Sequence, residues 1–66
     1  MAELSTASKT AADLIEAIEE KYGENTTWWM KKIITEVRVK IADDTVDRHD
    51  IQALIHQDNA DQRWLQ

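Results

Sequence analysis

The chain has 66 residues with no Cys, no Pro and a single Gly, and its formal net charge at neutral pH is −5. The lack of Cys excludes disulfides and thiolate metal sites, and the scarcity of Gly and Pro favours long helices over a turn-rich β architecture. No apolar run approaches the ~18 residues that a membrane span needs, and the N-terminus lacks a signal-peptide pattern. We therefore expect one soluble, cytoplasmic domain near the lower size limit for independent folding.

The first predicted helix covers residues 10–22. Residues 1–9 are small and polar, so we expect a flexible lead-in followed by a single helical domain over residues 10–66. Thr10 is the expected N-terminal cap, and Gly23 has the position of a left-handed C-terminal cap. One face of this helix is apolar and consists of Ala11, Leu14, Ile15, Ile18 and Tyr22.

A central helix is predicted over residues 27–42, with Asn25, Thr26 or Thr27 as its cap. Its core-facing residues fall within one arc of about 100° and are Met30, Ile33, Ile34, Val37 and Ile41. Trp29 borders this arc. Trp28 and Val39 lie nearly opposite it, eleven residues or about three helical turns apart. This second apolar strip is either covered by the chain's own neighbouring helices or available to another chain.

A strand is the alternative for residues 33–41. This segment is rich in β-branched residues, and from Glu36 to Ile41 polar and apolar residues alternate. A strand here requires pairing between chains, because the sequence has no second alternating run and no hairpin turn.

The third predicted helix covers residues 46–57 and is capped by Asp47. Its inner face is thin and consists of Ile51, Leu54 and Ile55. Gln57, Asp58 and Asn59 predict a break, followed by a short turn or fourth helix near residues 60–65. Trp64 and Leu65 either fold back over the core or contact a partner.

These elements predict an all-α fold, a small three-helix bundle with a possible short fourth helix. The apolar residues are few for the entropy cost of ordering the chain, so we expect dimerisation or a partner to complete the bundle. Positive charge is concentrated in the central helix, and the flanking segments are acidic. Such complementarity pairs helices within one bundle, or aligns two copies of the chain.

Catalytic and metal-binding motifs are not apparent. His49 and His56 share an outward helix face, but their spacing of seven residues is not typical of zinc ligands. The carboxylates Glu16, Glu19 and Glu20 are expected to face water, where general acid or base work is not favoured. We therefore predict no enzymatic activity, cofactor, metal or small-molecule substrate.

The favoured function is a non-catalytic interaction module, a small acidic regulator or adaptor of a bacterial or phage type. It would contact another copy of itself or a larger protein, and no membrane, through Trp28, Trp29, Val39, Trp64 and Leu65.

The alternative is a DNA- or RNA-binding regulator that uses the central helix. Its candidate residues are Lys31, Lys32, Arg38 and Lys40, with the neighbouring tryptophans available for stacking on bases. The net charge of −5 argues against this alternative, and it also allows the inverse role, in which the acidic faces imitate DNA.

Overall fold

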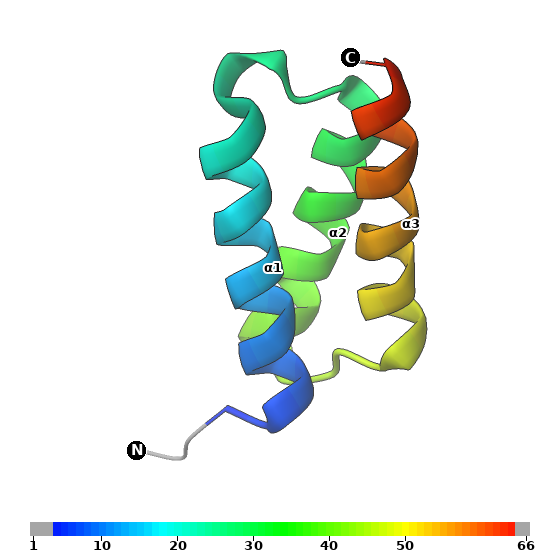
Figure 1. The fold of residues 1–66 in the computed structure, drawn as a ribbon. Coiled ribbons are helices and arrows are strands. Elements are labelled where there is room, and N and C mark those ends of the chain that lie inside the picture. The colour runs from blue at the N-terminus through cyan, green and yellow to red at the C-terminus, as the bar shows by residue number, and fades with distance from the viewer. Residues whose placement is uncertain (1–3, 65–66) are drawn as a thin grey trace.

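A computed structural model describes residues 4–64, without the side chain of Trp64. Three helices run up, down and up (Figure 1). They are α1 (Thr6–Tyr22), α2 (Trp28–Asp43) and α3 (Arg48–Trp64), and a single 3₁₀ turn, η1 (Gly23–Asn25), follows α1. The residues described contain no strand, so the all-α prediction is confirmed and the strand alternative for residues 33–41 is wrong.

Helix α1 begins four residues earlier than the sequence predicts. Ser5, and not Thr10, is its N-terminal cap, and the Ser5 hydroxyl accepts a hydrogen bond from the Ser8 backbone N–H at 3.3 Å. The predicted lead-in therefore overlaps the first turn of α1. At the other end Gly23 adopts a positive φ of 54°, as the sequence predicts, although its ψ of −122° lies outside the left-handed helical region.

Helix α2 is capped by Thr27, one of the three predicted candidates, whose hydroxyl accepts a hydrogen bond from the Met30 N–H at 3.2 Å. The helix ends at Asp43. Asp44 then adopts the left-handed conformation, with φ 55° and ψ 42°, and its N–H donates to the Ile41 carbonyl.

Helix α3 is continuous, and the predicted break at Gln57–Asn59 is wrong. The helix also extends through the segment 60–64, where a separate turn or fourth helix was expected. Asp47 caps the start of α3, as the sequence predicts. Its carboxylate accepts a hydrogen bond from the Asp50 N–H at 3.1 Å, and the Asp50 carboxylate accepts one from the Asp47 N–H at 3.0 Å.

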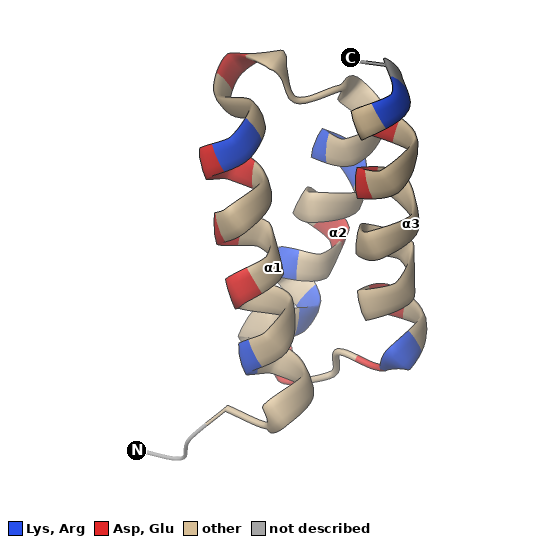
Figure 2. Cartoon of the chain, in the orientation of Figure 1, with Lys and Arg blue, Asp and Glu red and all other residues tan. Residues whose placement is uncertain are grey.

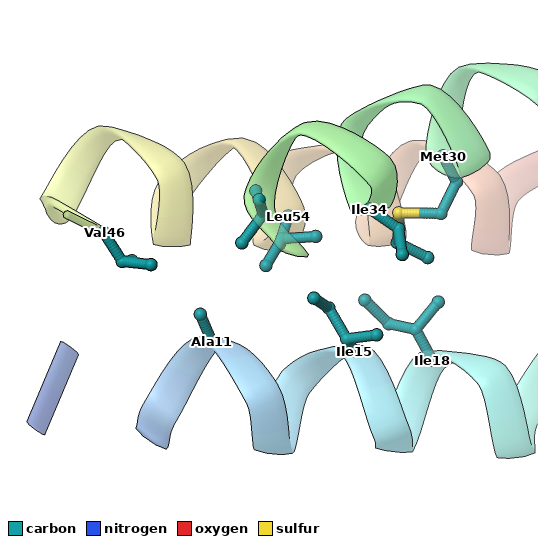
Figure 3. Close-up of a cluster of buried hydrophobic side chains, with 8 residues drawn as sticks. Ala11, Ile15, Ile18, Met30, Ile34, Val46 and Leu54 are labelled. Atoms are coloured by element: carbon teal, nitrogen blue, oxygen red, sulfur yellow. The ribbon is translucent and has the colours of Figure 1, made fainter. Parts of the chain in front are cut away.

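The core is built by all three helices and by Val46 of the loop between α2 and α3, and it lies along the axis of the bundle (Figure 3). Its buried apolar residues are Ala11, Ile15, Ile18, Met30, Ile34, Val37, Val46 and Leu54. The prediction that Ile55 lies on the inner face of α3 is wrong, because Ile55 is 43% exposed and does not face the core. The inward face of α3 instead continues from Leu54 to Asp61, which is 2% exposed.

Ion pairs join each helix to the other two. Figure 2 shows acidic residues along α1 and basic residues along α2. Arg38 of α2 pairs with Glu19 of α1, and Lys40 of α2 pairs with Asp50 of α3 at 2.8 Å. Lys21 of α1 pairs with Asp58 of α3 at 3.0 Å. The predicted complementarity between a basic central helix and acidic neighbours thus operates within one chain.

Candidate functional site

The candidate site is the solvent-facing side of α2, which we call the outer strip. Its members are all exposed and are Trp28, Trp29, Lys32, Thr35, Glu36, Val39 and Asp43. At 100° per residue they fall on one side of the helix, opposite the buried Met30, Ile34 and Val37.

A buried carboxylate from α3 fixes the end of α2 that carries the tryptophans. The Thr27 hydroxyl donates to Asp61 Oδ2 at 3.0 Å while it caps the helix, and the Gln57 amide donates to Asp61 Oδ1 at 2.9 Å. A negative charge beside the first turn of α2 also complements the positive end of the helix dipole. The first turn of α2 is therefore held at a defined position on the bundle.

The two tryptophans stack on each other at this end. The ring centroids of Trp28 and Trp29 are 4.2 Å apart, and the ring planes differ by 24°. Both rings stay in contact with solvent, because Trp28 is 63% exposed and Trp29 is 51% exposed. A stacked pair has little rotamer freedom left to lose when a partner covers it.

Positive charge accompanies the tryptophan pair. The Lys32 ammonium lies 5.7 Å from the centroid of the Trp29 ring, within the range of a cation–π interaction. Lys31 is also exposed, and it lies on the side of α2 that faces α1, where it lines a groove together with Glu19. The first half of the outer strip is therefore aromatic and basic.

The second half of the outer strip is aliphatic and acidic. Val39 is 59% exposed and lies between Glu36 and Asp43 on the helix surface. The two basic residues of this half are directed to the sides, Arg38 toward Glu19 and Lys40 toward Asp50. The outward-facing charged residues of this half are therefore Glu36 and Asp43, which are both acidic.

The structure brings together only some of the predicted site residues. Trp28, Trp29 and Val39 share the outer strip, and the rise of the helix separates Trp28 from Val39 by about 16 Å. The Trp64 side chain and Leu65 lie outside the described part of the chain. Of the predicted nucleic-acid residues, Lys31 and Lys32 are exposed, whereas Arg38 and Lys40 bind carboxylates of the same chain.

A polar cluster that the sequence analysis missed joins the start of α1 to the end of α2. Asp44 Oδ1 accepts hydrogen bonds from the Ser8 hydroxyl at 2.6 Å, the Ser5 hydroxyl at 2.8 Å and the Ser5 N–H at 3.1 Å. These bonds lower the pKa of Asp44, with the Ser8 hydroxyl as the largest cause. Ser8 is fully buried, which is an unusual location for a residue of an expected lead-in.

A second missed cluster links α1 to α3. The Tyr22 hydroxyl donates to Asp58 Oδ1 at 2.7 Å, and the Lys21 ammonium contacts Asp58 Oδ2. Burial, assisted by the hydrogen bond to Asp58, raises the pKa of Tyr22 to about 12. Burial alone would raise the pKa of Asp58, but the bonds from Tyr22 and Lys21 outweigh it and lower that pKa.

Two shallow grooves flank the Arg38–Glu19 ion pair between α1 and α2. Their volumes are about 530 and 280 Å³. Gly23, Thr26 and Ile34 line the larger one, and Ala12, Ile15 and Ile41 line the smaller one.

The three carboxylates of α1 that the sequence analysis considered for acid or base chemistry are exposed, and so are both histidines. These carboxylates are Glu16, Glu19 and Glu20. Within residues 4–64, no group of three or more side chains has the arrangement of a metal site.

No family model, curated protein or solved structure matches the chain. None of the helices in the described part of the chain is long and apolar enough to cross a membrane.

Proposed function

We propose that the protein is a non-catalytic interaction module that docks on a protein partner through the outer strip of α2. The observation that carries this proposal is the stacked, solvent-exposed pair Trp28 and Trp29 on a helix whose opposite face already fills the core. The fold does not require these two rings inside, and tryptophan is among the residues that contribute most to binding at protein interfaces.

The surroundings of the tryptophan pair also favour a protein partner. Thr27 and Asp61 fix the backbone that carries the pair, so a partner meets a preorganised surface. The strip combines aromatic and aliphatic area with charges of both signs, and such a mixture suits recognition of another protein surface. The proposed protein binds a partner without performing a reaction, so its role would be that of a regulator or an adaptor.

Nucleic-acid binding is the second candidate, and it is supported by one observation. Lys31 and Lys32 lie beside the two exposed rings, on which unpaired bases could stack. Against it, Arg38 and Lys40 are paired with Glu19 and Asp50, so the basic residues of α2 without a carboxylate partner among residues 4–64, Lys31 and Lys32, lie in its first half. A protein partner uses the whole strip.

The test is site-specific photo-crosslinking in the cell. A photoreactive amino acid is placed at Thr35, in the middle of the outer strip, and in a control chain at Glu20 on the exposed face of α1. We expect a protein adduct from position 35 and none from position 20. No protein adduct from position 35, or equal adducts from both positions, would contradict the proposal, and an adduct removed by nuclease would favour the second candidate.

A matched pair of variants then assigns the contact to the tryptophans. Trp28→Ala should remove the adduct formed at position 35, whereas Ile55→Ala should leave it, because Ile55 is an exposed apolar residue of α3 outside the strip. Loss of the adduct in both variants, or in neither, would show that the contact at position 35 does not depend specifically on Trp28.

A further inference from the structure

The outer strip is divided by charge along the length of α2. Trp28, Trp29 and Lys32 form an aromatic and basic first half, whereas Glu36, Val39 and Asp43 form an aliphatic and acidic second half. The positive charge of the first half complements the negative charges of the second half. Between Trp28 and Val39, apolar side chains lie at the two ends and the opposite charges of Lys32 and Glu36 lie nearer the middle.

We infer that the occupant of the outer strip is a second copy of the same chain, bound antiparallel about a two-fold axis. This inference rests on the proposed function and names its partner. In a two-fold pair the same surface patch is used by both copies, so the patch must be complementary to itself. Antiparallel pairing places the basic half of each copy against the acidic half of the other, whereas parallel pairing would oppose like charges.

The spacing of the residues selects one register. If the axis crosses α2 at the level of Ile34, residues equally far before and after position 34 face each other between copies. Lys32 then faces Glu36 of the second copy. Trp28 and Val39 lie on the same flank of the strip, so Trp28 meets Val39 of the second copy within one residue of the same level, with Trp29 beside it. Each contact occurs twice. A shift that set Trp28 opposite Asp43 would instead oppose Lys32 to Val39 and lose both kinds of contact.

Contacts inside each bundle prepare the strip for this pairing. Glu19 draws the Arg38 guanidinium toward α1, and Asp50 draws the Lys40 ammonium toward α3. Both cations are thereby held at the sides of α2. Thr35 lies next to the axis, and its hydroxyl donates to the Lys31 carbonyl at 2.9 Å.

The length of the contact predicts a reversible dimer. The paired part of the strip runs from Trp28 to Val39, about 16 Å of helix. A single helix face of this length covers less than the roughly 800 Å² per partner of a standard stable interface. Association should therefore depend on protein concentration and weaken as salt screens the pairs between Lys32 and Glu36.

Charge reversal measured by sedimentation at low salt tests the inference. The wild-type chain should change from its mass of 7.7 kDa to twice that mass as its concentration rises. Lys32→Glu and Glu36→Lys should each weaken self-association by about tenfold or more, because each turns two attractive pairs into two repulsive ones. Glu20→Lys, on the exposed face of α1, should associate like the wild type. Circular dichroism establishes that each variant is folded.

Mixing the two weakened variants gives the sharpest result. In a pair of Lys32→Glu with Glu36→Lys, both cross-copy contacts again join opposite charges, so an equimolar mixture should regain the double mass. A wild type that stays at 7.7 kDa at every concentration would overturn the inference, as would single reversals that associate normally or a mixture that stays monomeric.

Photo-crosslinking at position 35 distinguishes a wrong occupant from a wrong binding surface. A monomeric wild type that still yields an adduct from position 35 with a different protein overturns the second copy as occupant and leaves the interaction module intact. If the occupant is a second copy, the adduct from position 35 has twice the mass of the chain.

Discussion

At the scale of single residues, Asp44 holds the start of α1 against the end of α2. Its carboxylate accepts three hydrogen bonds, two from Ser5 and one from the buried Ser8, and they lower its pKa. A carboxylate whose folded pKa lies below its unfolded pKa stabilises the fold fully above the unfolded value, near 3.9. That stabilisation is lost as the pH falls through the folded pKa.

We expect Asp44→Asn to lower the free energy of unfolding at neutral pH and to reduce its decline below about pH 4. Asparagine also tolerates the left-handed conformation of this position, so the backbone is retained. Urea unfolding over a pH series measures both effects. Asp43→Asn, one residue earlier and exposed, is the matched control and should follow the wild type. Part of the acid decline should remain in Asp44→Asn, because the pKa values of Asp50 and Asp58 are also lowered.

The ionisation of Tyr22 can be measured directly at alkaline pH, because Tyr22 is the single tyrosine of the chain. We expect the tyrosinate absorbance of the folded protein to rise with a midpoint near pH 12, since burial and the bond to Asp58 disfavour the charged form. Its contribution to stability is complete below the ordinary pKa of 10.0 and is lost as the pH rises toward 12. A midpoint near 10 while circular dichroism still reports the folded helices would contradict this contact.

At the scale of whole elements, the predictable helices are those whose apolar residues recur with the helical period. The inward stripes of α1 and α2 follow that period, and both helices were predicted from it. Helix α3 has the same period, but polar residues occupy its inward positions after Leu54, and the consecutive polar residues Gln57, Asp58 and Asn59 predict a break. Their partners Tyr22 and Thr27 are more than thirty residues away in the chain, beyond any local pattern.

Asp61 is the inward polar residue on which the end of α3 depends most. Asp61→Ala should lower the free energy of unfolding by about 1–3 kcal/mol, because the buried bonds from Thr27 and Gln57 are lost together. Asn59→Ala, on the exposed side of the same helix, should stay within about 0.5 kcal/mol of the wild type. Chemical denaturation of both variants provides the measurement, and equal losses in the two would argue against a structural role for the Asp61 carboxylate.

At the scale of the whole molecule, the outer strip could be located from the sequence, but its charge pattern could not. The spacing of Trp28 and Val39 predicts a second apolar strip, and the structure places both residues in solvent. The sequence grouped Arg38 and Lys40 with Lys31 and Lys32 as one basic surface. Contacts with Glu19 and Asp50 divide that group, and they depend on how α1 and α3 pack against α2.

We propose that folding and docking use opposite faces of α2. The most direct test is the sedimentation of Trp28→Ser/Val39→Ser beside the wild type over a range of concentrations, with both proteins folded by circular dichroism. Because both residues are exposed, the variant should keep its helices and remain at 7.7 kDa throughout, while the wild type doubles its mass. A folded variant that associates as the wild type does would contradict the claim.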